Sequence, residues 1–314
     1  MADNITFSHV PVLLGQCLEG LLTDPEGIYV DCTLGGGGHS ERIVQALRGN
    51  GRLICIDRDE DAIRAASARL APYRDRITFV HRNFSEVGEI LAELGIEKIT
   101  GALADLGVSS YQLDTPQRGF SYLHDAPLDM RMDTSASLSA YRVVNEYPEE
   151  ELYRILRDYG EERFAKRIAG LIVQRRAEKP IERTRELCEI ASEAIPAKFK
   201  NDGHPARRTF QAIRIEVNGE LEIIPSTVHR LTNLLAPGGR LCIITFHSLE
   251  DRLVKEAFAE EAKGCTCPKD FPVCVCGKVP KVKILTKKPI TADEEELIQN
   301  SRSHSAKLRI AEKL

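Results

Sequence analysis

Residues 31–39 read Asp31-Cys32-Thr33-Leu34-Gly35-Gly36-Gly37-Gly38-His39 and close an apolar segment that begins at Ile28. Helical spacing of apolar residues follows at 40–47, and a second apolar segment at 52–56 stops at Asp57. Strand, glycine-rich turn, helix and strand form a βαβ unit, from which parallel sheets covered by helices are built. Glycines adopt positive φ and leave room for a ligand, while the following helix offers free amides. The stretch predicts a ligand site at the carboxyl edge of a doubly wound sheet, with an unliganded sharp turn as the alternative.

The alternation of strands and helices continues along the chain and is interrupted once. Further strands are expected at 77–80, 101–106 and 240–246, with edge strands at 281–286 and 306–311. Between about 111 and 211 the apolar residues follow helical spacing only, at 149–156, 162–176 and 184–194. We therefore expect residues 1–112 and 212–314 to form the two portions of one α/β domain, and residues 113–211 to form a helical insertion.

The glycine run discriminates between two nucleotide ligands. A dinucleotide fingerprint, G-x-G-x-x-G, needs a third glycine where Ser40 stands, which argues against NAD. The spacing from Asp31 to Gly37 instead matches the acidic-x-x-x-Gly-x-Gly pattern familiar from class I methyltransferases that use S-adenosylmethionine.

Three residues after the second, third and fourth strands suit such a ligand. Asp57 can accept both hydroxyls of a ribose, unless it is an ordinary helix N-cap. Phe84 can lie against an adenine, unless it packs in the core. Asp105 is expected at the carboxyl edge, where an acidic group suits a positively charged sulfonium better than a pyrophosphate.

Composition and charge exclude several classes of protein. The 314 residues are 42% hydrophobic and 29% charged, which is typical of globular chains and excludes fibrous and disordered ones. No apolar run reaches the roughly 18 residues that cross a bilayer, and residues 1–10 lack the basic flank and apolar stretch of a signal peptide, so a cytoplasmic protein without a membrane partner is expected. The net charge is -4, but residues 163–214 hold 13 Lys and Arg against 6 Asp and Glu. This local excess of positive charge is more informative about binding partners than the net charge of the whole chain.

Nine cysteines are present, and five of them are scattered singly, which argues against a secreted disulfide framework. The other four form Cys265-x-Cys267 and Cys274-x-Cys276 in a Cys-rich loop at 265–276. Four thiolates suit a structural zinc, although the usual pairs are separated by two to four residues rather than by one. A reduced, redox-labile hairpin is the alternative.

Long motifs in a fixed order connect the chain to one family. They are His9-x-Pro11-Val12-Leu13-Leu14, the 31–40 run, Asp105-Leu106-Gly107-Val108-Ser109-Ser110-x-Gln112-Leu113-Asp114, Arg118-Gly119-Phe120-Ser121, the 125–133 segment, Gly160-Glu161-Glu162, the 204–211 segment, Arg214-Ile215-Glu216-Val217-Asn218, the 246–252 segment and Ser305-Ala306-Lys307-Leu308-Arg309. With these motifs, nearly from end to end, the chain resembles the bacterial 16S ribosomal RNA cytosine-N4 methyltransferase family, the MraW family.

The resemblance implies a class I S-adenosylmethionine-dependent methyltransferase fold, a Rossmann-like α/β sheet interrupted by a helical substrate-recognition insertion. It implies methylation of N4 of a cytidine in the decoding centre of 16S ribosomal RNA, with S-adenosylmethionine as donor and a role in ribosome biogenesis. The family's cofactor contacts fall on Gly37, Gly38, His39, Asp57, Phe84, Asp105 and Gln112.

The catalytic groups are less well defined. Many amino-methyltransferases carry an Asn-Pro-Pro-aromatic motif after the fourth strand, whereas this chain reads Asp105-Leu106-Gly107-Val108. Our hypothesis is that Asp105, with Ser109 or Ser110, orients the donor and the amine, and that Phe120 or Tyr122 stacks on the target base. The proton acceptor stays open, and the cytosine must be unpaired or flipped to react.

The basic insertion is the expected RNA-binding surface. Its candidate phosphate contacts are Arg163, Lys166, Arg167, Arg207 and Arg208, with Arg175, Arg176, Lys198 and Lys200 in addition. A solvated helix surface is the alternative for each of them.

Two other functions remain open from the sequence. An NAD-linked enzyme is favoured only by the βαβ pattern and Asp57, and a non-catalytic RNA-binding assembly factor is favoured only by the basic insertion. The expected partner is 16S ribosomal RNA or the small ribosomal subunit. The oligomeric state is open, a dimer included.

Overall fold

The computed structural model describes residues 11–199, 203–267 and 275–314. The chain forms two compact units, Met1–Gly107 with Leu221–Leu314, and Val108–Glu220. The limits predicted from the sequence, 112/113 and 211/212, fall inside two helices of the second unit, α5 (Ser110–Asp114) and α10 (Arg207–Asn218). Helix α10 is continuous and packs on other helices of that unit, so no boundary divides it.

The first unit contains a seven-stranded sheet in the order β3-β2-β1-β4-β5-β7-β6. The strands are β1 (Ile28–Asp31), β2 (Arg52–Asp57), β3 (Ile77–His81), β4 (Ile99–Asp105), β5 (Leu235–Thr245), β6 (Val282–Ile284) and β7 (Lys307–Lys313). Strands β1 to β5 are parallel, and β7 pairs antiparallel with β5 and β6. All seven strands expected from the sequence are present, and the predicted fold class, an α/β Rossmann-like sheet interrupted by a helical segment, is confirmed.

Strand β5 differs most from its predicted extent, because it begins at Leu235 rather than at 240. Leu235 pairs with Ile99 of β4, and the register shifts between Ile99 and Gly101. The Pro237-Gly238-Gly239 segment lies between Leu235 and Arg240, at this shift in register.

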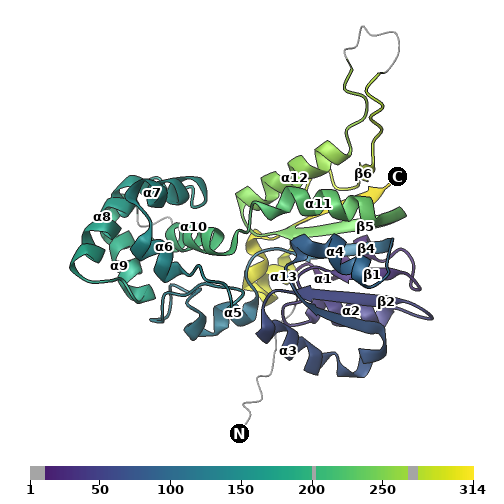
Figure 1. The fold of residues 1–314 in the computed structure, drawn as a ribbon, viewed down its shortest axis with the longest axis horizontal. Coiled ribbons are helices and arrows are strands. Elements are labelled where there is room, and N and C mark those ends of the chain that lie inside the picture. The colour runs from purple at the N-terminus through teal and green to yellow at the C-terminus, as the bar shows by residue number, and fades with distance from the viewer. Residues whose placement is uncertain (1–10, 200–202, 268–274) are drawn as a thin grey trace. The chain divides into compact units, whose positions relative to one another are not determined.

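Helices cover both faces of the sheet (Figure 1). On one face, α1 (Leu14–Leu21), α2 (Gly38–Ala46) and α3 (Glu60–Arg69) contribute to a core shared with Tyr29, Leu53 and Leu103 of the strands. A second group of helices consists of α4 (Val87–Glu93), α11 (Ile223–Leu234) and α12 (Ser248–Glu261). Helix α11 contacts both α4 and α12. Helix α13 (Glu294–Gln299) precedes β7. Because β1, β2 and β4 end at the same edge, Asp31, Asp57 and Asp105 all lie at the carboxyl ends of parallel strands.

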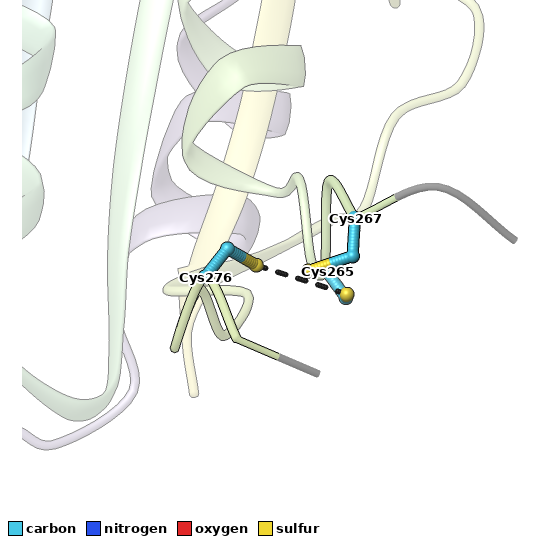
Figure 2. Close-up of side chains that lie close together, drawn as sticks. All are labelled: Cys265, Cys267 and Cys276. Carbon is cyan, nitrogen blue, oxygen red and sulfur yellow. Dashed lines mark hydrogen bonds between the residues drawn. The ribbon is translucent and has the colours of Figure 1, made fainter. Parts of the chain in front are cut away.

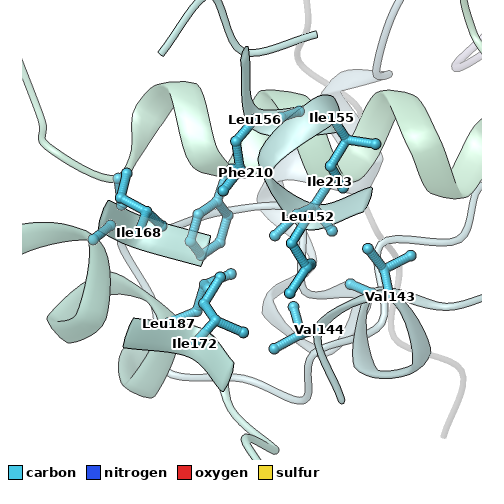
Figure 3. Packing of buried hydrophobic residues seen from close by; sticks show 14 of the residues in the cluster. Val143, Val144, Leu152, Ile155, Leu156, Ile168, Ile172, Leu187, Phe210 and Ile213 are labelled. Atoms are coloured by element: carbon cyan, nitrogen blue, oxygen red, sulfur yellow. The ribbon is translucent and has the colours of Figure 1, made fainter. Parts of the chain in front are cut away.

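The second unit is helical, and its described residues contain no strand beyond an isolated bridge between Pro127 and Arg183. Its remaining helices are α6 (Ala140–Glu146), α7 (Glu149–Asp158), α8 (Ala165–Glu178) and α9 (Thr184–Ala194). Leu152, Ile168, Ile172, Leu187 and Phe210 meet in its core (Figure 3). The unit therefore has an apolar core of its own, as a separately packed domain requires.

Candidate cofactor and catalytic site

The glycine run forms the turn between β1 and α2. Gly35 and Gly37 have φ of 49° and 76°, values that favour glycine, and Gly37 is the N-cap of α2. A Cβ atom on Gly38 would collide with the ring of Pro11. The run therefore has conformational and packing reasons to be glycine, and it presents the first turn of α2 at the edge where β1 ends.

Asp31, at the end of β1, accepts hydrogen bonds from residues of this turn. One donor is Ser40, which stands where the dinucleotide fingerprint has its third glycine. The carboxylate of Asp31 is buried and accepts hydrogen bonds from Ser40 Oγ at 2.7 Å and Thr33 N at 3.1 Å. Burial raises the pKa of Asp31, and hydrogen bonds from the Ser40 side chain and from the backbone and side chain of Thr33 oppose that rise. A glycine at position 40 would remove the Ser40 donor.

Asp57 ends β2 and faces the glycine turn. Its Oδ2 accepts Gly35 N at 2.8 Å, and its Oδ1 accepts Asp59 N at 2.9 Å. The N-cap of α3 is Asp59, which accepts Asp61 N, so the interpretation of Asp57 as the helix cap is wrong. Burial raises the pKa of Asp57 to about 6, against the two backbone hydrogen bonds that lower it. Each carboxylate oxygen has lone pairs left for further donors, such as ribose hydroxyls.

Asp105 ends β4 and is the most perturbed carboxyl group of the edge. About a quarter of its side chain (26%) is exposed, but its Oδ1 is buried and accepts no hydrogen bond from the described residues. Burial, followed by the negative charges of Asp31 and Glu250, raises the pKa of Asp105 to about 8. A buried acceptor without a donor is costly, and a cationic donor at this point would relieve both the missing hydrogen bond and the repulsion.

His39 lies beside Asp105 without neutralising it. Its Nδ1 is 3.7 Å from Asp105 Oδ2, and its Nε2 donates to the carbonyl of Val12 at 3.0 Å. Burial lowers the pKa of His39 to about 4, so the imidazole is neutral at physiological pH. His39 therefore adds no positive charge at this edge that would repel a cationic ligand.

Phe84 begins a short 3₁₀ turn, Phe84–Glu86, just after β3. The turn is positioned by Asn83, whose side chain accepts Ser85 N at 3.0 Å. Phe84 is half-buried rather than fully enclosed, and its contact with an adenine stays a prediction.

Ser109, Ser110 and Gln112 belong to the second unit, at the start of α5. Ser109 Oγ accepts Gln112 N at 3.2 Å, and Gln112 Oε1 accepts Ser109 N at 2.9 Å, which is a capping box. These contacts give Ser109 and the buried Gln112 a structural function in α5. Their predicted catalytic and cofactor-binding roles stay predictions.

The two aromatic candidates for stacking on the target base differ in access. Phe120 is 5% exposed and packs in the core of the second unit, so the hypothesis that it stacks on a base is wrong. Tyr122 is half-buried and stacks on His204, with ring centroids 4.4 Å apart and planes inclined by 16°. The burial of Phe120 could not be predicted from its motif, because it depends on the apolar core that residues of helices α6 to α10 form with it.

The basic residues of the second unit divide into two groups. Arg163, Lys166, Arg167, Arg207 and Arg208 are exposed, and Arg208 also donates to the carbonyl of Glu161. Arg176 instead donates to the carbonyls of Val144 at 2.7 Å and Tyr147 at 2.6 Å, and Arg175 pairs with Glu193 at 2.6 Å. Arg176 therefore has a structural role within the unit, whereas the exposed ion pair of Arg175 leaves its phosphate contact a prediction. Lys198 is exposed, and Lys200 lies outside the described residues.

Two features of the sites were not predicted from the sequence. Phe164 and Phe199 form a tilted ring pair, and Arg163 and Lys198 lie 4.7 Å and 4.9 Å from the centre of the Phe199 ring. The other feature is the fully buried Glu250, whose charge contributes to the raised pKa of Asp105. The pattern His247-x-x-Glu250 before an apolar helix is a capping-box signal that indicated the position of Glu250, though not its burial.

Three cysteines of the Cys-rich loop converge: the sulfur atoms of Cys265, Cys267 and Cys276 lie within 4.8 Å of one another (Figure 2). Cys274, the fourth predicted zinc ligand, lies outside the described residues.

Comparison with known proteins connects the chain to one family. A model of the MraW methylase family matches residues 6–314. A protein of Clostridium botulinum (strain Kyoto / Type A2) named "Ribosomal RNA small subunit methyltransferase H" is 57% identical over 308 residues, covering 98% of this chain and 99% of its own length. A protein of Heliobacterium modesticaldum with the same name is 57% identical over 312 residues, covering 99% of this chain and 100% of its own length.

Among solved structures, an rRNA methylase from Streptococcus thermophilus is similar at a TM-score of 0.41 and 12% identity, over 96% of this chain and 93% of its own. Within the part of the chain that the structure describes, no helix is both long and apolar enough for a membrane span.

Proposed function

Because the chain belongs to the MraW methylase family, we propose that it transfers a methyl group from S-adenosylmethionine to N4 of one cytidine in the decoding centre of 16S ribosomal RNA. The observation that carries the cofactor assignment is the buried Oδ1 of Asp105, which has no donor among the described residues and lies at the end of β4 in an acidic edge. The names of the two relatives support ribosomal RNA of the small subunit as the substrate.

The residues at the edge fit this cofactor. Asp57 would accept ribose hydroxyls with its remaining lone pairs, and Phe84 would lie against the adenine. Gly37, Gly38 and His39 would place backbone amides beside the ligand without a side chain in its way. Asp105 would accept a hydrogen bond from a cationic group at Oδ1, which has no donor among the described residues. Gln112, from the second unit, is proposed as a contact on the resemblance alone.

The chemistry places modest demands on side chains. The cofactor supplies a methyl group bonded to a sulfonium, an electrophile that needs no metal. The lone pair of N4 would form the new N–C bond as the C–S electron pair returns to sulfur, and the proton that N4 then loses would pass to solvent water. Positioning of the two reactants can supply about 7–11 kcal/mol of the barrier. We assign this positioning to Asp105, with Ser109 or Ser110 as the proposed partner toward the amine.

We assign RNA binding to the second unit. Arg163, Lys166, Arg167, Arg207 and Arg208 have the exposure that phosphate contacts need. The ring pair of Phe164 and Phe199, flanked by the cations of Arg163 and Lys198, resembles the aromatic and basic surfaces on which unpaired bases stack. The partner would be 16S ribosomal RNA or the small subunit, and the place of action would be the cytoplasm.

The test is methyl transfer to small subunits prepared from cells that lack this protein, with isotopically labelled S-adenosylmethionine and mass spectrometry of the 16S RNA. The expected product is one methyl group on N4 of one cytidine, and methylation of another atom or of no RNA would refute the assignment. Binding of RNA without methyl transfer would favour the non-catalytic assembly factor. Calorimetric binding of NAD without binding of S-adenosylhomocysteine would favour the NAD-linked enzyme.

The cysteine loop takes part in no step of this reaction. Its role as a zinc site is a separate proposal.

A further inference from the structure

The excursion, residues 262–281 between α12 and β6, has no buried apolar residue in its described parts, whereas an apolar core normally fixes a segment of this length. Two arms, residues 262–267 and 275–281, run side by side away from the sheet (Figure 1). No residue of either arm is buried, and Val275 and Val279 are 75% and 71% exposed. A surface segment of this kind must be held by something other than hydrophobic burial, and small structures without a core commonly use a disulfide or a metal.

The base of the excursion is closed by ordinary contacts. Lys281 N donates to the carbonyl of Glu261 at 2.9 Å, and Lys281 Nζ lies 3.2 Å from Glu261 Oε2. Glu260 pairs with both Lys263 and Lys278, at 3.4 Å and 2.9 Å. These contacts bring the arms together at the end near α12 and β6. Surface ion pairs each contribute only about 0–1 kcal/mol, so these contacts do not account for the pairing of the arms farther from the sheet.

The outer part is where the cysteines meet. Cys265 and Cys267 come from the first arm and Cys276 from the second, and the Cys276 and Cys265 sulfurs are 3.7 Å apart (Figure 2). Tetrahedral zinc with Zn–S bonds of about 2.3 Å places two sulfur ligands about 3.8 Å apart. The observed separation matches this value and far exceeds the roughly 2.05 Å of a disulfide bond.

Backbone amides reach across the arms to two of these sulfur atoms. Thr266 N donates to Cys276 Sγ at 3.4 Å, and Val275 N donates to Cys267 Sγ at 3.3 Å. Each donor belongs to the arm opposite its acceptor. Hydrogen bonds of this kind stabilise thiolates and orient them, as the groups surrounding metal ligands do.

From the convergence of the three sulfurs and these amide contacts, we propose that Cys265, Cys267 and Cys276 bind a structural zinc ion that joins the two arms. A donor set made only of thiolates selects zinc over magnesium or calcium, which prefer oxygen. The ion holds the two arms together in place of a buried apolar core, and its binding free energy contributes to the folding of the arms. The site is independent of the proposed methyl transfer.

The experiment measures metal directly in the full-length protein, purified with a thiol reductant and without chelator. Elemental analysis should find about one zinc per chain. Replacement of zinc by Co2+ should give the intense visible bands and the near-ultraviolet charge-transfer band of tetrahedral cobalt thiolate. The variant Cys265→Ser/Cys267→Ser should lose at least about 90% of the zinc and both spectral features, while binding of S-adenosylhomocysteine is unchanged.

Two control variants separate ligands from bystanders. Cys188→Ser removes a thiol of the second unit, and Val279→Ala alters an exposed side chain of the same arm, so both should keep the metal. Zinc well below one per chain in the wild type together with no cobalt–thiolate band would overturn the proposal. So would zinc retained in full by Cys265→Ser/Cys267→Ser, because the ion would then be elsewhere. If the wild type transferred no methyl group, the proposed function would fail, but these metal measurements would still test the zinc site.

Discussion

The raised pKa of Asp105 makes binding of a cationic ligand dependent on pH. Without ligand, the carboxyl group is largely protonated below its pKa of about 8, because it is buried near Asp31 and Glu250. S-adenosylmethionine carries a positive charge, so it binds the ionised form better and must displace a proton at lower pH. The affinity for S-adenosylmethionine should therefore rise as the pH increases from 6.5 to 8.5.

The size of the effect follows from the pKa. If the bound form is fully ionised, the dissociation constant changes by about 25-fold over these two pH units, which corresponds to about 2 kcal/mol. The substitution Asp105→Asn removes the titrating group and should flatten this part of the profile. Asp57 has a pKa of about 6, so it affects the profile mainly below this range.

Isothermal titration calorimetry at pH 6.5, 7.5 and 8.5, in two buffers with different ionisation enthalpies, measures both the affinity and the protons released. The wild type should release close to one more proton than Asp105→Asn at pH 6.5. Titration of the ligand's own amine is common to both proteins and cancels in the difference. Asp75→Asn, at an exposed carboxylate of the same unit, is the matched control and should behave as the wild type. Equal pH profiles for the wild type and Asp105→Asn would refute the assignment of Asp105 to the cationic end of the ligand.

Four further sets of variants test other parts of the structure. Gly38→Ala should lower both cofactor affinity and the melting temperature because its methyl group meets Pro11, whereas Gly88→Ala, in α4 with open space around it, should stabilise the protein by about 0.5–1 kcal/mol in thermal unfolding. Ser40→Gly should destabilise by about 1–3 kcal/mol in denaturant unfolding, since Asp31 loses a buried donor, and an unchanged midpoint would contradict this role. Arg207→Glu/Arg208→Glu should abolish or strongly weaken RNA binding and reduce the salt dependence by about 2 in slope, while cofactor affinity stays constant; Arg64→Glu in the first unit is the control in the same filter-binding assay. Phe199→Ala should cost about 1–3 kcal/mol of affinity for single-stranded RNA and Phe199→Tyr much less, and equal losses in both variants would argue against stacking.

Local sequence determined the architecture of the chain. The glycine run between two apolar segments specified the βαβ unit, since φ preference and period-2 or period-3.6 spacing act over a few residues. The same spacing indicated all seven strands and the helical character of the segment between β4 and β5. The acidic residues at the strand ends could also be placed, because parallel strands finish at one edge.

Tertiary packing decided the chemical state and the accessibility of particular side chains. The protonation of Asp105 depends on Asp31 and on Glu250, which are 74 and 145 residues away in the chain, and on burial that no single segment creates. The sequence suggests base stacking for Phe120 and a phosphate contact for Arg176. In the structure Phe120 lies in the core of the second unit, and the Arg176 guanidinium donates to two backbone carbonyls. The convergence of Cys265 and Cys276 likewise requires the two arms to lie together. Desolvation and long-range contacts depend on the whole fold, whereas backbone preference and periodicity are properties of adjacent residues.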